Sequence, residues 1–474
     1  MSTFSGLGTA ASGLSAARAA LEVTGQNVAN ANTEGYTRQR VVQSPIAQTS
    51  LATYATQNPY GDGVRVVGVA RLNDAVVDAR VNSTAAASSY WGTAASAAGA
   101  VESSLNEPGT NGLTKVMNDF WSAWQQMANN PGSAAIGNTL IAQGQLVAST
   151  VSTGYSSAVD AWTEARGAAA SAATTINTAA TQVAELNTSI RSLSAAGGNV
   201  NSLLDQRDAA VTTLAKLTGA STRGNADGTI DVIVGGNALV SGSITRAVQL
   251  NSAVTFPVDS SSAQVALVWS DTGTSVSLSG GEMAARVASL QAANGGTGGV
   301  YAEAAQAYND AAKSIADKVN ALHEQGTTST GATSTAGSPL DFFRYTGAST
   351  AASTLAVVPV SVAGIASADG TKGKLDNTFA DRIAQLGTGA DSPNASWATY
   401  VSRLGSQVAT ASARSTTADT ASAAATTAQN SNSGVDLDEE TANLVIYQHA
   451  YQASARVIST INDVLDTLIN MGAR

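Results

Sequence analysis

The sequence predicts a mainly α-helical protein with a β-rich insert, an α+β fold. Helical patterns fill most of the chain before residue 219 and after residue 281, whereas short β-type runs separated by turn residues lie between them. Apolar residues also recur every seventh position near both termini, which is the spacing of a coiled-coil seam. We therefore expect helices from the two ends to pair in a coiled-coil or helical-bundle stem, with the central β region projecting outward.

The composition favours long, thin helical packing over a thick globular core. Of the 474 residues, 43% are hydrophobic, yet only 5% are aromatic and 12% are charged. Small side chains let helix backbones approach closely, and few large ones are present to fill a wide core. The length allows two to four domains at the usual size of about 100–200 residues each.

Residues 4–31 carry the first coiled-coil pattern. A leucine or valine recurs every seven residues, and a small residue follows each by three positions. Glycines weaken this helix in isolation, each by about 1 kcal/mol relative to alanine, so it needs a partner to persist. Residues 27–36 end it, because asparagine and glycine tolerate left-handed backbone. The packing residues predicted at this end are Leu7, Leu14, Leu21, Val28, Asn30, Asn32, Gly35 and Tyr36.

The next part of the chain is mostly helical. An extended stretch over 41–77 contains alternating valines typical of a strand or two. A predicted helix over 113–130 places large apolar residues on one face, which we expect to be buried in a core. Those residues are Val116, Phe120, Trp121, Trp124 and Met127. The other helices predicted before residue 219 span 74–105, 134–193 and 201–217.

Residues 220–280 have the pattern of a compact β-rich insert. Asp227-Gly228 is a hairpin turn signal between two short β-type runs, and further short runs continue to residue 278. The stretch from 325 to 375 is short and mixed. Helical patterns occupy 282–291, 300–323, 377–386 and 396–427.

The last segment carries a second and stronger coiled-coil seam. Its apolar residues again recur every seven positions, with a second apolar residue three positions after most of them and Ser454 as the polar exception. Asp436 and Glu439 resemble a capping box at its start. The same residues could instead form an internal bundle without a partner chain. The packing residues predicted at this end are Leu437, Leu444, Tyr447, Tyr451, Ile458, Ile461, Leu465 and Leu468.

Three domains follow from this order. Residues 1–40 with 434–474 form a terminal coiled-coil region. Residues 41–219 with 281–433 form a helix-rich stem, and residues 220–280 form the outer β insert. A chain that leaves along helices and returns along helices brings its two ends together, so the two seams can pair.

No recognisable catalytic, metal-binding or cofactor-binding motif is present, and we predict none of these sites and no cofactor. The only histidines are His323, at a predicted helix C-terminus that favours a cation, and His449, on a helix flank. The acidic run 436–440 is explained by its place at a helix start. The glycine run 295–299 lacks the strand and lysine of a phosphate loop, so we interpret it as a flexible turn.

The charge and hydropathy patterns exclude several classes of partner. A net charge of −10 argues against binding to nucleic acid or to anionic membrane surfaces. No apolar run is long enough to cross a bilayer, so no membrane insertion is expected. The N-terminus has no basic and apolar regions of a signal peptide. An extracellular location would therefore require export without a cleaved signal.

Several blocks of the sequence resemble one family. Residues 7–36, with Ala29-Asn30-Ala31-Asn32-Thr33 and Gly35-Tyr36, resemble the N-terminal motif of flagellar rod, hook and hook-associated axial proteins. Thr37-Arg38-Gln39-Arg40 is similar to the hook-associated protein 1 family in particular. Leu203-Leu204-Asp205-Gln206-Arg207-Asp208 and the C-terminal block that begins Gly434-Val435-Asp436-Leu437-Asp438-Glu439-Glu440 are further matches.

The resemblance implies a structural subunit of the bacterial flagellum, at the junction between hook and filament. It implies the hook protein, hook-associated protein 3 and copies of this chain in a ring as partners. It also implies an export chaperone on the C-terminal helix, the flagellar type III export channel and an extracellular location on the flagellum.

Other functions remain open at this stage. One alternative is another axial protein, either hook protein or flagellin, and a less favoured one is a secreted coiled-coil adhesin. An enzyme carried in the β insert, with Asp231 and Asp259 as paired carboxylates, is the third alternative.

Overall fold

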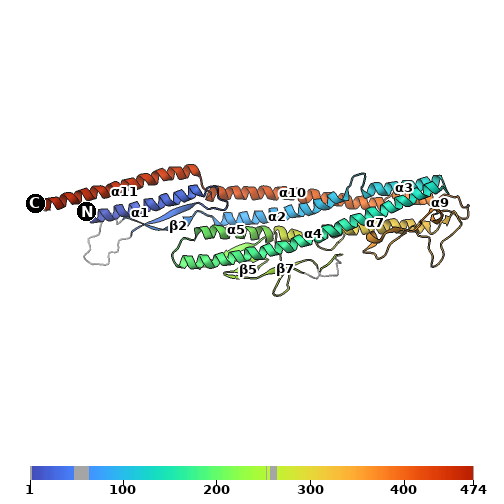
Figure 1. The fold of residues 1–474 in the computed structure, drawn as a ribbon, viewed down its shortest axis with the longest axis horizontal. Coiled ribbons are helices and arrows are strands. Elements are labelled where there is room, and N and C mark those ends of the chain that lie inside the picture. The colour runs from blue at the N-terminus through green and yellow to red at the C-terminus, as the bar shows by residue number, and fades with distance from the viewer. Residues whose placement is uncertain (1–2, 47–62, 252–253, 257–263, 473–474) are drawn as a thin grey trace. The chain divides into compact units, whose positions relative to one another are not determined.

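The computed structural model describes residues 3–46, 63–251, 254–256 and 264–472. Long helices dominate it, as the sequence predicts, and Figure 1 shows them in chain order. The α-helices are α1 Thr3–Ala29, α2 Ala75–Leu105, α3 Leu113–Asn129, α4 Ala134–Ala195, α5 Asn201–Thr218, α6 Gly281–Ser289, α7 Val300–His323, α8 Ala351–Thr354, α9 Thr378–Ala384, α10 Pro393–Ser433 and α11 Leu437–Gly472. Short 3₁₀ turns lie at Val362–Gly364 and Gln385–Gly387.

The strands form small antiparallel sheets. β1 pairs with β2 across a bulge at Val42 and Gln43, and residues 47–62 of the predicted extended stretch lie outside the described residues. β3 to β6 form a four-stranded sheet in chain order, β7 pairs with β8, β9 with β12, and β10 with β11. Their bounds are β1 Gln39–Pro45, β2 Val64–Arg71, β3 Ser221–Gly224, β4 Ile230–Val234, β5 Asn237–Ser241, β6 Ile244–Thr245, β7 Val248–Leu250, β8 Leu267–Trp269, β9 Thr327–Thr328, β10 Phe343–Arg344, β11 Ala356–Val357 and β12 Ala366–Ala368.

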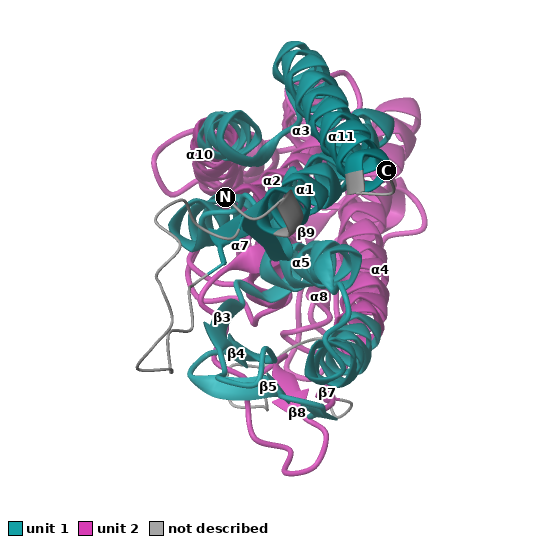
Figure 2. Ribbon diagram, turned by 90° about the vertical axis from the view of Figure 1, so that its left-hand side faces the viewer, with its two compact units in different colours: residues 1–85, 178–246, 419–474 teal, residues 86–177, 247–418 magenta. Residues whose placement is uncertain are grey.

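The contacts divide the chain into two compact units, coloured teal and magenta in Figure 2. Unit 1 contains residues 1–85, 178–246 and 419–474, and unit 2 contains residues 86–177 and 247–418. The strands of the β-rich stretch are shared out between them, β3 to β6 in unit 1 and β7 with β8 in unit 2. The three-domain division with an insert over 220–280 therefore stays a prediction.

In unit 2, the core is built from aromatic side chains of α3 and of residues 342–343. Phe120, Trp124 and Phe342 are fully buried, and the Trp124 and Phe342 rings lie 5.2 Å apart between centroids. Tilted and edge contacts of this kind add to the stabilisation from burial alone. All five residues of the predicted apolar face of α3 are buried, which confirms that prediction.

His323 ends α7 inside this aromatic core, where its ring is fully buried. Nδ1–H donates to the carbonyl oxygen of Leu340 (2.5 Å), and Nε2 accepts from the N–H of Ala366 (2.8 Å). Burial lowers the pKa of His323 to about 4, although the hydrogen bond to Leu340 and the charge of Asp341 act in the opposite direction. The prediction of a cation at this helix end is wrong, because desolvation outweighs the helix dipole.

Asparagines on the long helices hold neighbouring extended segments by their backbone. On α4, the Asn187 Nδ2 donates to the carbonyl oxygens of Ile230 (2.8 Å) and Gly242 (2.7 Å), and Oδ1 accepts from the Ile230 N–H (3.1 Å). An amide side chain offers a donor and an acceptor side by side, as a peptide group does. We call this arrangement an asparagine clamp. Three more helix asparagines bind backbone in the same way, Asn177 on Val248, Asn309 on Ser349 and Ala352, and Asn320 on Phe342 and Phe343.

Candidate assembly site at the paired terminal helices

In unit 1, helices α1 and α11 lie side by side, so the two ends of the chain pair as the sequence predicts. The buried face of α1 is mostly made of small side chains, including Ala10, Ala17 and Thr24 from the predicted seam. A Cβ added at Gly6 would lie 3.4 Å from Ile461, and one added at Gly13 would lie 3.2 Å from the Ser454 hydroxyl. Small residues and glycines on α1 therefore allow α11 to approach closely.

The facing side of α11 is a row of half-buried residues with heptad spacing. These residues are Leu444, Tyr447, Ser454, Ile458, Ile461 and Leu465. All but Ser454 belong to the packing residues predicted at this end. The remaining three of that set are exposed, with Leu437 at 48%, Tyr451 at 39% and Leu468 at 52%.

The packing residues predicted on α1 do not lie at the centre of its contact face. Leu7, Leu14 and Leu21 are half-buried and Val28 is 38% exposed, whereas alanines, Val23 and Asn27 are buried instead. At the helix end, Asn32 and Gly35 are exposed and Asn30 and Tyr36 are half-buried. Gly35 has a φ of +78°, which is left-handed backbone. This agrees with the expectation that glycine ends the helix by adopting that conformation.

A second apolar row of α11 is exposed. Its members are Val457, Val464 and Met471, which recur every seven residues and expose 45–70% of their surface. Large apolar residues at other heptad positions of α11 are exposed as well, namely Val445, Ile446, Leu468 and Ile469. Helix α11 therefore uses one apolar face against α1 and presents another to solvent.

A partly buried polar network joins the C-terminal end of α1 to the start of α11, and we call it the polar joint. Its residues are Asn27, Tyr36, Arg38, Gln39, Glu439 and Glu440. Asn27 donates from Nδ2 to the Gln39 carbonyl oxygen (2.9 Å) and to Glu440 Oε2 (3.1 Å). Its Oδ1 accepts from the Gln39 N–H (3.0 Å) and the Tyr36 hydroxyl (2.9 Å). Asn27 is thus a further asparagine clamp, on β1.

Arg38 contributes the positive charge of the polar joint. Its Nε donates to Glu440 Oε1 (2.7 Å) and its Nη1 donates to Glu439 Oε2 (2.6 Å). Burial acts to lower the pKa of Arg38, but the hydrogen bonds and charges of Glu439 and Glu440 raise it. Burial, followed by the charges of Asp205 and Glu440, raises the pKa of Tyr36 to about 12, so it remains a hydrogen-bond donor at neutral pH.

A second ion-pair network fixes β2 to α5 beside the polar joint. Arg71 Nη2 lies 2.9 Å from Asp205 Oδ1 and donates to Asp208 Oδ2 (2.6 Å) and to the Thr37 hydroxyl (3.0 Å). Burial raises the pKa of Asp205, while Arg71 and Thr37 act in the opposite direction. Asn201 adds a hydrogen bond to Gln39 Oε1 (2.9 Å).

These contacts give a structural role to three blocks of the sequence that were selected because they resemble the flagellar axial family. Residues 37–40, 203–208 and 434–440 lie far apart along the chain, yet their charged and amide side chains meet around β1 and β2. The packing residues predicted from the sequence do not include Asn27, Arg38 or Glu440. The signal that could have found them is the pairing of one arginine with two adjacent glutamates in separate blocks of the motif.

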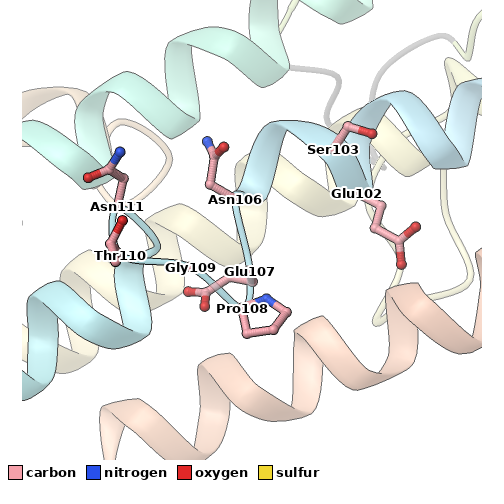
Figure 3. A pocket seen from close by; sticks show the side chains of 8 residues that line it. All are labelled: Glu102, Ser103, Asn106, Glu107, Pro108, Gly109, Thr110 and Asn111. Atoms are coloured by element: carbon pink, nitrogen blue, oxygen red, sulfur yellow. The ribbon is translucent and has the colours of Figure 1, made fainter.

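A polar cavity of about 460 Å³ lies in unit 2 at the turn between α2 and α3, and Figure 3 shows its lining side chains. Glu107 is already committed to the fold, because its Oε1 accepts from the Thr114 N–H (2.7 Å) and from Trp397 Nε1 (3.0 Å). The other carboxylate, Glu102, comes from the last turns of α2. Within the described residues, no cluster of three or more histidine, aspartate or glutamate side chains has the geometry to hold a metal ion.

The carboxylates considered for catalysis in the β insert do not form a described pair. Asp231 accepts from Arg223 Nη2 (2.8 Å), Asn225 Nδ2 (3.0 Å) and the Gly242 N–H (3.0 Å). These hydrogen bonds lower the pKa of Asp231. Asp259 lies outside the described residues. Among the helices of the described ranges, none combines the length and hydropathy that a membrane span requires.

The glycine run before α7 forms a turn that binds a carboxylate of the same chain. Glu303 Oε1 accepts from the backbone N–H groups of Asn294 (2.6 Å), Gly296 (2.8 Å) and Gly298 (3.0 Å). A Cβ at Gly298 would lie 2.1 Å from the Ala292 carbonyl oxygen, so only glycine fits there. The N–H groups that a phosphate loop would offer to a ligand are therefore used by Glu303.

We expect Glu303→Gln to destabilise unit 2 by about 1–3 kcal/mol, because a neutral amide accepts three N–H groups less strongly than a carboxylate. Chemical denaturation of the purified chain measures the change. Glu282→Gln is the matched control, since its pair with Arg286 (2.6 Å) is a partly exposed contact within one helix and is worth about 0.5 kcal/mol or less. Equal losses in the two variants would contradict the role of Glu303.

Three family models match this chain. A model described as the flagellar hook-associated protein FlgK helical domain matches residues 98–341. The C-terminal model of flagellar basal body rod FlgEFG proteins matches residues 429–471, and the flagella basal body rod protein model matches residues 7–37. The two shorter matches coincide with most of α11 and of α1, the helices that pair in unit 1.

Relatives with the same protein name match this chain over nearly the whole length of both sequences. Flagellar hook-associated protein 1 of Bacillus subtilis (strain 168) is 29% identical, over 99% of this chain and 98% of its own. That of Escherichia coli (strain K12) is 26% identical, over 98% and 99%. The flagellar hook junction protein FlgK from Burkholderia pseudomallei has a similar fold, with a TM-score of 0.62 and 15% identity over 74% of this chain and 100% of that one.

The helical-domain match covers about half of the chain, and the paired terminal helices match the rod-protein models on either side of it. The chain therefore belongs to the flagellar hook-associated protein 1 (FlgK) family, as a structural protein of the hook–filament junction of the bacterial flagellum.

Proposed function

We propose that this chain assembles into the hook–filament junction through the exposed apolar row of α11 together with the seam residues of α1 and α11. The observation that carries this proposal is the exposure of Val457, Val464 and Met471, at seven-residue spacing, on a helix whose other face already packs on α1. Apolar residues in heptad spacing gain their stabilisation only when a second helix covers them.

The partners follow from the family and from the chemistry of this surface. An apolar helical row fits helices of other axial subunits, and we infer these to be the hook protein, hook-associated protein 3 and copies of this chain in a ring. The same row suits an export chaperone that covers α11 before assembly. The outer position of residues 220–280 and export without a cleaved signal belong to this proposal as well.

The same proposal includes no catalytic activity. The polar side chains that resemble catalytic groups are used within the fold: His323 bridges two backbone segments, Glu107 caps a helix and Glu303 closes a turn. A structural role for these groups agrees with a family of structural flagellar proteins.

The test is Val457→Asp, which places a charge on the exposed row. Val457 is 48% exposed, so we expect the helical content and unfolding transition of the purified chain to stay unchanged. In an assembled junction, however, an unpaired carboxylate would be buried, at a cost of several kcal/mol. Cells with the variant should build hooks, fail to attach filaments and release filament protein into the medium.

Two further variants make the outcome specific. Asn462→Asp adds the same charge at an exposed polar position of α11 and should leave filaments normal. Ile458 lies on the side of α11 that faces α1. Ile458→Asp should therefore weaken the α1–α11 pair in the purified chain, before any assembly. Normal filaments with Val457→Asp would show that the exposed row is not an assembly surface.

A further inference from the structure

The chain contains two Asn-Gly dipeptides, Asn111-Gly112 and Asn294-Gly295, and both lie in unit 2. The side-chain carbonyl carbon of an asparagine can be attacked by the backbone nitrogen of the next residue. Glycine favours this reaction, because it has no Cβ to block the approach and its backbone rotates freely. Both asparagines are exposed, so water reaches both. The dipeptides are therefore alike in sequence and exposure, and the contacts around them decide which one reacts.

Asn294 is fixed through its backbone and its side chain. Its N–H donates to Glu303 Oε1 (2.6 Å), and its carbonyl oxygen accepts from the Thr297 N–H (3.1 Å). Its Nδ2 donates to the Thr297 hydroxyl (3.0 Å). On the other side of Gly295, the Gly296 N–H also donates to Glu303 (2.8 Å). The side chain must swing over the Gly295 nitrogen to react, so several of these bonds have to break first.

Asn111 is held much less firmly. It lies in the turn before α3, and its side-chain amide makes no hydrogen bond with the described part of the chain. The Gly112 N–H donates to the Gly109 carbonyl oxygen at 3.3 Å, which is longer than usual for such a bond. Asn111 lines the polar cavity of about 460 Å³ (Figure 3) and a second cavity of about 260 Å³. The amide therefore has space to rotate against a weak restraint.

We propose that Asn111 is a site of spontaneous covalent modification and that the turn around Asn294 protects the second dipeptide. The Gly112 nitrogen loses its proton to water and attacks Cγ of Asn111. The N–Cγ bond forms, the Cγ–Nδ2 bond breaks, and the amide nitrogen takes up a proton and leaves as ammonia. A water molecule then opens the succinimide. Cleavage of the new bond gives aspartate, and cleavage at the backbone carbonyl gives isoaspartate, in which the main chain runs through the side chain.

Isoaspartate at this position disturbs the start of α3. It lengthens the main chain just before Gly112, where even an added Cβ would lie 2.6 Å from Glu107 Cδ and 2.9 Å from the Asn106 carbonyl oxygen. Glu107 Oε1 accepts from the Thr114 N–H and from Trp397 Nε1. Because the space is filled, the longer main chain displaces Glu107 from these two partners. Aspartate keeps the length of the main chain and so preserves both bonds.

Peptide mapping of the purified full chain, kept folded at mildly alkaline pH, tests the site. Trypsin releases Asn111 and Asn294 on separate peptides, which end at Lys115 and Lys313. The mass gain of an amide-to-acid conversion, located by fragmentation, should appear at Asn111 about tenfold faster than at Asn294. In denaturant, where neither turn persists, the two rates should become similar. Equal rates in the folded chain, or no conversion at Asn111, would overturn the proposal.

Substitutions at the exposed Thr297 test the protection of Asn294. Thr297→Val removes the hydroxyl that holds the Asn294 amide, so conversion at Asn294 should speed up toward the rate at Asn111. Thr297→Ser keeps a hydroxyl and is the matched control, in which conversion should remain slow. If Thr297→Val left the rate at Asn294 unchanged, the contrast between the two turns would not be its cause.

Denaturant unfolding tests the effect on α3. A parent chain aged until isoaspartate has accumulated at residue 111 should unfold at a lower denaturant concentration than the fresh chain. Asn111→Gln, whose longer side chain closes the ring far more slowly, should unfold alike before and after ageing. Fresh Asn111→Asp, which makes the other product directly, should unfold like the fresh parent. An aged parent that carries isoaspartate at residue 111 and keeps the midpoint of the fresh chain would refute the effect on α3.

Discussion

Asn187→Ala is expected to lower the free energy of unfolding by about 3 kcal/mol or more. Asn187 is fully buried and satisfies the N–H and carbonyl of Ile230 and the carbonyl of Gly242. It also accepts from Arg207 Nη1 (3.2 Å). Each buried polar group without a partner costs about 1–3 kcal/mol, and water entering the gap would offset part of the loss.

Arg207 increases the expected effect of Asn187→Ala. Its guanidinium is buried, which lowers the pKa of Arg207, and its Nε has no hydrogen-bond partner within the described part of the chain. Chemical denaturation of the purified chain measures the change. Ser189→Ala on the exposed side of α4 is the control, since it removes only a bond to the Glu185 carbonyl of the same helix. A loss no larger than that of Ser189→Ala would contradict the clamp.

The stability of the chain should fall by about 3 kcal/mol between pH 6.5 and pH 4 because of His323 alone. Its pKa is lowered to about 4 in the folded chain, against about 6.5 when unfolded. The unfolded chain therefore binds a proton first as the pH falls. The contribution of His323 is fully present above pH 6.5 and is lost progressively toward pH 4.

A comparison of slopes isolates this histidine from other titrating groups. Burial raises the pKa values of Asp205 and Glu324, and these carboxyls act in the opposite sense over the same pH range. His323→Gln should therefore flatten the fall in melting temperature between pH 6.5 and 4, whereas His449→Gln on exposed α11 should leave it unchanged. In NMR spectra of the parent chain, the His323 ring should remain neutral at pH 5. A ring that titrates above pH 6 would refute the prediction.

The sequence was sufficient to predict the helices but not the packing of their faces. Heptad spacing located α1 and α11 and their pairing, because a periodic apolar pattern depends only on local residues. It did not show that α1 would bury Ala16, Ala20 and Asn27 in preference to Leu7 and Val28. That choice depends on β1, β2 and α11 approaching the side of α1 where side chains are small.

The polar joint was not predictable from local patterns. Arg38 and Glu440 lie 402 positions apart, so no window of sequence contains both. The helix dipole is by itself a sufficient reason for an acidic first turn. The sequence therefore gave no separate indication that Glu440 also binds Arg38 and Asn27. His323 shows the same limit, because its place at a helix end is visible in the sequence whereas its burial against Trp124 and Phe342 is not.

The asparagine clamps have a consequence for how sequences of this kind can diverge. A clamp contacts the N–H and C=O groups of the segment it holds, and these groups are the same whichever side chain the segment carries. Substitutions at Ile230 or Val248 therefore leave the clamp bonds in place, while a substitution of Asn187 or Asn177 removes them. Variation should accumulate in the held strands and be resisted at the few amides on the helices that hold them.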